Sequence, residues 1–280
     1  MSKRFYLDTS VVHSRLVGHV SIRNRLSSKL KNQKRITSHF VKMEFERNFV
    51  CDLIEFYFVL KDQRSVIEAK KYWAEHYQKR KIKNILSIDD VFTDIDDDDT
   101  ERALFKLRSQ IKTIIICFKH LIHRYENDNV GCFFSNVDLN FSICDSAEEI
   151  EKAFVAFYAY FDKKNYIDKC KIVVLFKVKY DAIKKITQYD YKSDGFEAQK
   201  EKLNSIIEGK KKLSCNSCKE IGDTIIALEC PEYAILLTTD DSFMGLCKAL
   251  NLQYEIIPSV RSMVRIGDVL AKLTKIVGRR

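Results

Sequence analysis

Short apolar runs alternate along this chain with longer segments of helical periodicity. The first run, residues 4–7, is aromatic and apolar and ends at Asp8. Comparable runs end near Ser38 and just before Asp240, and a last one covers residues 253–257. Short apolar runs bounded by polar or turn residues predict buried strands. We therefore expect strands near both ends of the chain, each closed by acidic or hydroxyl residues.

Amphipathic helices are expected between and after these strands. Residues 39–60 place apolar side chains at steps of three and four, which gives one core-facing side. In residues 146–161, Ser146 followed by Glu149 forms a capping box, a signal for a helix N-terminus. Further helices are predicted over residues 64–82, 100–125, 181–186, 196–207, 242–250 and 261–277, and a strand over residues 84–88. Residues 172–178 are dense in β-branched and aromatic side chains.

The composition fits a globular protein of mixed secondary structure. The chain has 280 residues, 46% of them hydrophobic, but only eight Gly and two Pro. These values argue against a loop-rich β-sandwich and favour mostly helix with some strand. The length suits one large domain or a domain that carries an embedded second one.

The cysteines and the apolar runs indicate a cytoplasmic protein without a membrane segment. The nine Cys are odd in number and irregularly spaced, and the N-terminus lacks a signal-peptide pattern. We expect reduced thiols in a cytoplasm-like compartment. The apolar run at residues 111–122 is interrupted by Lys112, Lys119 and His120, and it is too short to span a bilayer.

The charge is basic and unevenly distributed. The formal net charge is +9. Residues 1–60 hold eleven Lys or Arg against five Asp or Glu, whereas residues 89–101 hold eight acids and no base. Such a charge favours an anionic partner, most often a nucleic acid, although general solubility is the simpler explanation. Within the acid-rich segment, the acidic run at residues 94–99 is expected to be a solvated loop that caps the following helix.

Four carboxylates stand at related positions. Asp8 and Asp240 follow predicted strands, Glu44 lies one turn into the helix after residues 36–38, and Asp223 lies on a helix before the strand that leads to Asp240. The carboxyl ends of parallel strands meet at one edge of a sheet, where ligands bind. Hard divalent ions such as Mg²⁺ or Mn²⁺ prefer carboxylate oxygens and water. This pattern suits hydrolysis of a phosphodiester by a metal-activated water.

Four short motifs in this order resemble the PIN-domain nucleases. They are F-Y-L-D-T-S at 5–10, I-T-S-H-F-V-K-M-E-F at 36–45, G-D-T-I-I-A-L at 222–228 and L-L-T-T-D-D-S-F at 236–243. The resemblance implies a three-layer α/β/α sandwich around a short parallel sheet. It assigns catalysis and Mg²⁺ or Mn²⁺ binding to four acids, with three supporting residues: Asp8, Glu44, Asp223 and Asp240, supported by Ser10, Thr238 and Asp241.

The chain also departs from the family pattern. Ser242 stands where a second acid is often found, and Asp241 beside it is a candidate substitute. The chain is considerably longer than a minimal domain of this family. We expect one PIN-like domain over 1–280, with 1–60 and 205–258 as its core. A mainly helical insertion would cover about 61–204, and a basic C-terminal helix 259–280.

The predicted function is a metal-dependent endonuclease that acts on RNA in preference to DNA. The main alternative is a catalytically inactive PIN-like module that binds nucleic acid or a protein partner. A zinc module built from Cys215-x-x-Cys218 with His120-x-x-His123 is a weaker alternative. A haloacid-dehalogenase-like phosphatase is disfavoured because Ser10 stands where its second Asp is needed. Whether the protein forms a homo-oligomer or binds a regulatory protein stays open, as does the identity of the residues that would bind nucleic acid.

Overall fold

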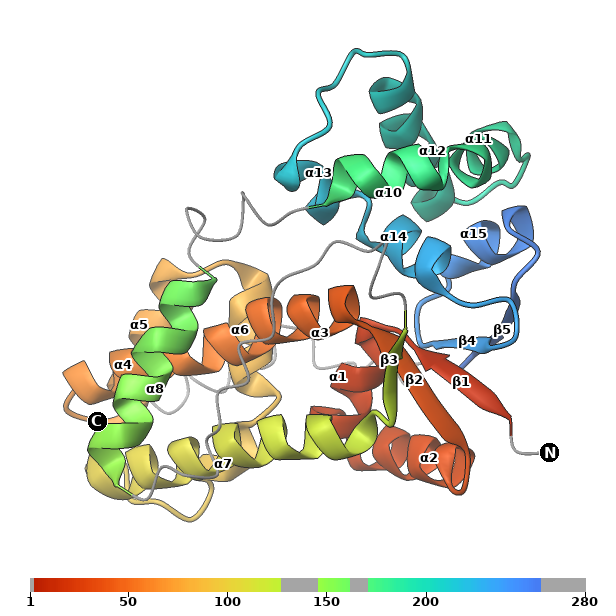
Figure 1. Cartoon of the computed structure of the whole chain (residues 1–280). Helices are drawn as coiled ribbons and strands as arrows, with labels where there is room; N and C mark the ends of the chain where they lie inside the picture. Colours follow the sequence, from red (N-terminus) through yellow and green to blue (C-terminus); the bar gives the residue numbers. More distant parts are fainter. Residues whose placement is uncertain (1–2, 127–145, 162–170, 258–280) are drawn as a thin grey trace.

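The protein is built around a five-stranded parallel sheet (Figure 1). The computed structural model describes residues 3–126, 146–161 and 171–257. The strand order is β3-β2-β1-β4-β5. In chain order the strands are β1 Arg4–Leu7, β2 Lys34–Ser38, β3 Arg124–Glu126, β4 Ile235–Thr238 and β5 Gln253–Ile256. The predicted α/β class with a short parallel sheet is therefore confirmed.

The central strand β1 joins the two ends of the chain. It pairs with β2 on one side and with β4 on the other, where Phe5 lies opposite Ile235 and Leu7 opposite Leu237. Phe5, Tyr6 and Leu7 are all buried. A continuous apolar run, rather than alternation, is what a parallel strand covered on both faces requires.

Helices cover both faces of the sheet. In Figure 1, α1, α2 and α7 lie on one side of the strands, and α14 and α15 lie on the other. Their bounds are α1 Thr9–Val17, α2 Val20–Leu30, α7 Thr100–Leu121, α14 Gly222–Glu229 and α15 Phe243–Ala249. This arrangement is compatible with the three-layer sandwich.

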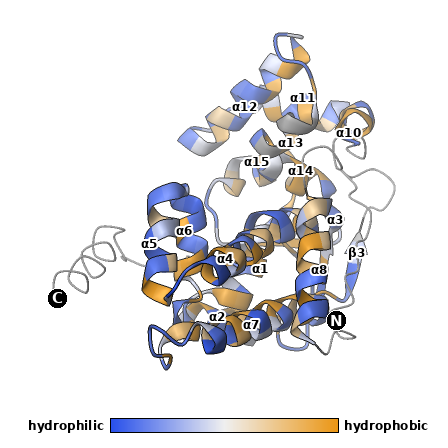
Figure 2. Ribbon diagram, turned by 90° about the vertical axis from the view of Figure 1, so that its left-hand side faces the viewer, coloured by the Kyte–Doolittle hydropathy of each residue, from blue (hydrophilic) through white to orange (hydrophobic). Residues whose placement is uncertain are grey.

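The predicted helix over residues 39–60 is confirmed, with a π-helical turn inside it. It consists of α3 His39–Phe45, the π-helix η1 Glu46–Val50 and α4 Cys51–Asp62. The side chain of Ser38 accepts a hydrogen bond from the Val41 N–H and caps its N-terminus. Helix α4 packs against α5, α6, α7 and α8, and Figure 2 shows its largely apolar surface enclosed among neighbouring helices.

The middle segment is helical, but several predicted boundaries were wrong. Its elements are α5 Val66–His76, α6 Lys79–Leu86, the 3-10 helix η2 Asp89–Phe92 and α8 Ala147–Tyr160. Residues 84–88 are not a strand, because Ile82, Ile85 and Ile88 recur at steps of three and pack inward from α6 and the turn after it. The helix predicted to reach residue 125 ends at Leu121, and β3 begins three residues later.

Other local predictions were confirmed. Ser146 and Glu149 form the expected capping box at the start of α8. The acidic run is a loop in which Asp99 caps α7 and Asp97 accepts a hydrogen bond from the backbone of α5. Trp73 is fully buried, so it packs in the core and does not form a nucleic-acid stacking surface.

A second group of helices packs against α14 and α15 (Figure 1). It comprises α10 Ile172–Val178, α11 Tyr180–Gln188, α12 Asp194–Ile207 and α13 Cys215–Glu220. Helices α11 and α12 pack against α15. Residues 172–178 are helical despite their β-branched composition, because Ile172, Leu175 and Phe176 share one buried side of a helix.

The basic C-terminal helix expected at 259–280 falls outside the described residues. Within the described ranges, no helix combines the length and the apolar character that crossing a membrane would need.

Candidate functional site

The sheet has its topological switch point between β1 and β4. The chain continues from β1 towards β2 on one side and from β4 towards β5 on the other. In open α/β sheets the connections diverge at such a point and leave a crevice at the carboxyl ends of the two strands. Asp8 directly follows β1, and Asp240 comes two residues after the end of β4. The structure therefore brings these two predicted acids to the same edge of the sheet.

Asp8 is buried and held by three donors. Its carboxylate accepts hydrogen bonds from the Val11 N–H at 2.8 Å, the Ser10 hydroxyl at 2.9 Å and the Thr238 hydroxyl at 2.7 Å. Only 1% of its surface is exposed. Asp8 is also the N-cap of α1.

Hydroxyl groups link Asp8 to Asp240. The Thr238 hydroxyl, which donates to Asp8, accepts a hydrogen bond from the Asp240 N–H at 2.9 Å. The Ser10 hydroxyl accepts from the backbone N–H of Thr239 at 3.0 Å and from its side-chain hydroxyl at 2.8 Å. The turns after β1 and β4 are thus tied together by Ser10 and Thr238, the two residues predicted to support the site.

Glu44 reaches the same edge from α3. Its carboxylate accepts a hydrogen bond from the hydroxyl of Thr9, the residue after Asp8. A Cβ added at Gly222 would lie 3.3 Å from Glu44 Oε1. The side chain of Glu44 therefore lies against the first residue of α14, immediately before Asp223.

Asp223 and Asp240 are connected through Ser242. The Ser242 N–H donates to Asp240 Oδ1 at 2.9 Å, and its hydroxyl lies 3.4 Å from Asp223 Oδ2. All four predicted acids are therefore connected by one network of contacts, which runs through hydroxyl side chains and the Gly222 backbone. We call these four residues the acid cluster: Asp8, Glu44, Asp223 and Asp240.

The acid cluster is electrostatically strained. Burial raises the pKa of Asp8 to about 7 even though its hydrogen bonds act in the opposite direction. Burial, followed by the charges of Asp240 and Glu44, raises the pKa of Asp223 to about 6. Burial also raises the pKa of Glu44, against the hydrogen bond from Thr9. Crowded carboxylates of this kind are stabilised in their charged form by a cation.

The donor set of the acid cluster matches a hard divalent ion. It offers carboxylate oxygens from four elements, and Mg²⁺ and Mn²⁺ prefer such ligands to nitrogen or sulfur. Each carboxylate is held by a hydroxyl or backbone donor as it stands. In the part of the chain that the structure describes, no three His, Cys, Asp or Glu side chains already form a metal-binding group. The donor chemistry and the charge fit a metal.

Cationic side chains flank the cluster. Burial raises the pKa of Glu44, and the charges of Arg47 and Arg80 offset part of that rise; Lys202 acts in the same way on the raised pKa of Asp223. Lys202 also donates to the backbone carbonyl of Glu220 at 3.0 Å, which fixes it close to α14. Lys202 lies on α12, Arg47 on the π-helix η1 and Arg80 on α6.

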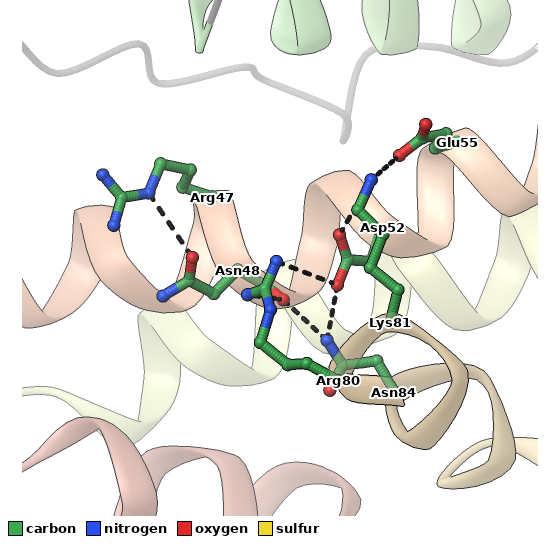
Figure 3. Close-up of polar contacts among 7 residues, drawn as sticks. All are labelled: Arg47, Asn48, Asp52, Glu55, Arg80, Lys81 and Asn84. Atoms are coloured by element: carbon green, nitrogen blue, oxygen red, sulfur yellow. Dashed lines mark hydrogen bonds and ion pairs between the residues drawn. The ribbon is translucent and has the colours of Figure 1, made fainter. Parts of the chain in front are cut away.

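The π-helix η1 positions one of these arginines (Figure 3). Arg80 on α6 donates to the backbone carbonyl of Asn48 at 3.1 Å, and Asn84 donates to the same carbonyl at 2.6 Å. Figure 3 shows both side chains also directed at Asp52, which is buried and lies 3.6 Å from Arg80 and 2.6 Å from Asn84. Helix α6 is thereby fastened to the helix that carries Glu44.

The sequence did not single out Thr9 and Ser242 as contacts of the acids. Both are hydroxyl residues next to a predicted acid or in the acidic turn, and that proximity was the only available signal. Asp241 is exposed, and in the described part of the structure no hydrogen bond or ion pair joins its side chain to the acid cluster. Its role as a supporting residue stays a prediction.

The zinc alternative depends on Cys215, whose side chain lies outside the described part of the structure, and it stays a prediction. Its second proposed thiol, Cys218, is buried. Comparison with protein-family models, with curated proteins and with solved structures gave no significant match. The function is therefore argued from the site alone.

Proposed function

We propose that this protein is a divalent-metal-dependent nuclease that hydrolyses phosphodiester bonds, with RNA preferred over DNA and with a PIN-like arrangement of its core. The observation that carries the proposal is the acid cluster at the switch point of the sheet. Four carboxylates from distant parts of the chain meet there through hydroxyl and backbone contacts, and three of them, Asp8, Glu44 and Asp223, carry raised pKa values.

Asp8, Glu44, Asp223 and Asp240 would hold Mg²⁺ or Mn²⁺. When bound, such an ion lowers the pKa of a water and neutralises charge on a phosphoryl oxygen. Burial of Asp8 and partial burial of Glu44 and Asp223 strengthen the attraction of these carboxylates for a cation, because the local dielectric constant is lower than that of water.

The hydroxyl residues fix the orientation of the carboxylates. Ser10 and Thr238 hold both oxygens of Asp8, and Thr9 holds Glu44. Preorganised ligands need less rearrangement when the substrate arrives. The cations Arg47, Arg80 and Lys202 would attract a phosphate group to the edge of the acid cluster.

The direct test is cleavage by the purified full-length chain. End-labelled single-stranded RNA and DNA are incubated with Mg²⁺, with Mn²⁺ or with EDTA. We expect metal-dependent cleavage of RNA that exceeds cleavage of DNA. Asp8→Asn and Asp240→Asn should each lower the rate by about 100-fold or more while circular dichroism shows a retained fold.

A matched control is Asp190→Asn, which makes the same change in charge at an exposed position on the segment between α11 and α12. Its rate should stay within about threefold of the unmodified chain. If the protein bound RNA without cutting RNA or DNA under any metal condition, and the Asn variants bound equally well, it would be the inactive binding module instead.

A further inference from the structure

A second polar site lies at the opposite end of the sheet from the acid cluster. It is a pocket of about 590 Å³ whose lining includes Arg15, Lys31, Lys34, Arg35 and His123. Lys34 and Arg35 are the first two residues of β2. Since β2 rises about 3.3 Å per residue and Ser38 is its last residue, the pocket is roughly 13 Å or more from the acid edge.

The fold gathers these cations from four separate segments. Arg15 lies in the last turn of α1, which runs back from the acid edge to the amino ends of the strands. Lys31 belongs to the turn between α2 and β2, where Asn32 adopts a φ of 58°. His123 precedes β3, and its backbone N–H donates to the Arg35 carbonyl at 2.8 Å. The pairing of β2 with β3 therefore builds one wall of the pocket.

The positive charge of the pocket is not balanced by acids. No Asp or Glu is among its described lining residues. In the described part of the chain, no ion pair engages Arg15, Lys31, Lys34 or Arg35. Burial and then the nearby charge of Arg15 lower the pKa of Arg35. Four unpaired cations around one cavity repel one another, and an anion would relieve this.

The hydrogen bonding of Arg35 points to a missing acceptor. Arg35 presents two donors to the ring of His123, its backbone N–H 3.1 Å from Nδ1 and its Nη2 2.8 Å from Nε2. A neutral imidazole has a single acceptor nitrogen, so one of these contacts places two donors against each other whichever tautomer is present. In addition, Arg35 Nε is buried without a hydrogen-bond partner.

We propose that this pocket binds a small molecule bearing a di- or triphosphate group. Phosphate oxygens would accept from the Arg35 guanidinium and from a ring N–H of His123, and would thus remove the donor conflict. Arginine suits this role because its planar fork matches the geometry of phosphate oxygens. Arg15, Lys31 and Lys34 would neutralise the remaining charge.

The size and the lining favour a phosphate-rich ligand. Four cations match the charge of a triphosphate chain. The volume lies within the usual range for small-molecule pockets, which is about 300–1,000 Å³. Apart from the His123 ring, the described lining offers no aromatic side chain on which a base could stack, and Leu30 is its one apolar member. The phosphates would therefore supply most of the recognition.

The experiment is calorimetric titration of the full-length chain with inorganic triphosphate, with ATP and with a single-stranded RNA oligonucleotide, all in EDTA. The pocket variant is Arg35→Gln combined with Lys34→Gln. The control is Arg25→Gln combined with Lys71→Gln, which removes two exposed cations outside the pocket and changes the net charge equally. Circular dichroism and thermal unfolding show whether both variants are folded.

We expect triphosphate and ATP to bind the unmodified chain and the control with similar affinity, and the pocket variant to bind at least tenfold more weakly. Lys31→Gln, an exposed substitution in a turn, should weaken binding about two- to fivefold without affecting the fold. The proposal is overturned if triphosphate does not bind, or if both double variants weaken binding equally. It is also overturned if only the oligonucleotide depends on the pocket cations, because the pocket would then belong to a nucleic-acid path.

This proposal does not depend on the nuclease. Asp8→Asn should abolish cleavage and leave triphosphate binding unchanged, whereas the pocket variant should lose triphosphate binding whether or not the chain cleaves RNA. Failure of either proposal can thus be recognised separately.

Discussion

The substitution Asp223→Asn tests whether charge crowding in the acid cluster is real. Asp223 is half-buried at the start of α14, and its pKa is raised to about 6 by burial and by the charges of Asp240 and Glu44. Asparagine has nearly the same shape and is uncharged. In the absence of metal it should therefore relieve a repulsion without leaving a cavity.

The sign and the size of this effect follow from linkage. A folded-state pKa raised above its unfolded value gives stability that is fully present below the unfolded pKa and is lost as the pH rises through the folded pKa. For Asp223 that window runs from its ordinary pKa of 3.8 to about 6. A rise of about two units corresponds to about 3 kcal/mol at pH 8. Loss of the weak contact with Ser242 reduces the net gain, so we expect Asp223→Asn to be about 1–3 kcal/mol more stable than the unmodified chain.

The assay is urea unfolding of both proteins in EDTA at several pH values from 4 to 8. The stability difference should be small at pH 4, grow through pH 6 and level off above it. Adding Mn²⁺ at pH 8 should reverse the order. A ligand at 100 times its Kd stabilises the folded state by about 2.7 kcal/mol, and only the unmodified chain keeps all four carboxylates. Asp190→Asn, the exposed control, should show neither effect.

Two results would refute this reasoning. If Asp223→Asn were less stable than the unmodified chain in EDTA at pH 8, the carboxylates would not repel one another as inferred. If Mn²⁺ stabilised both proteins equally, the ion would be binding elsewhere.

Two further predictions concern the contacts around the acid cluster. Thr238→Val removes a buried donor to Asp8 and should lower the free energy of urea unfolding by about 1–3 kcal/mol. Thr238→Ser keeps the hydroxyl and should recover most of this loss. A valine variant as stable as the unmodified chain would contradict the stabilising role of this hydrogen bond. Asn84→Ala removes a hydrogen-bond donor to the buried carboxylate of Asp52 and should lower the free energy of urea unfolding by a similar amount. An unchanged urea midpoint would show that α6 is held in place without the Asn84 side chain.

The sequence was sufficient to predict the strands that carry the site. Asp8 and Asp240 follow apolar runs whose length and composition are typical of buried parallel strands. Ser38 is the last residue of β2, the strand predicted to end there. These signals are local, and the structure agrees with them. The proximity of Glu44 and Asp223 depends instead on the packing of α3 against α14, which no local pattern determines.

The failed predictions have a common physical origin. Residues 172–178 have the composition of a strand, yet they lie in a helical group where only one side is buried. Strand β3 has three residues, and it forms because β2 offers an open edge. In both cases tertiary context outweighed intrinsic preference. The basic pocket was also missed, because the pairing of β2 with β3 is needed to bring His123 to Arg35.

The hydrogen bond between Thr238 and Asp8 joins residues that are 230 positions apart in the chain. During synthesis at about 5–20 residues per second, β1 would wait roughly 10–50 seconds for β4 to emerge from the ribosome. Until then one edge of β1 stays open, and Asp240, which follows β4, is not yet beside Asp8. If the chain is a nuclease, a nascent copy therefore lacks a complete acid cluster, and a copy terminated before residue 223 lacks two of its four acids, so neither should cut the messenger that encodes it.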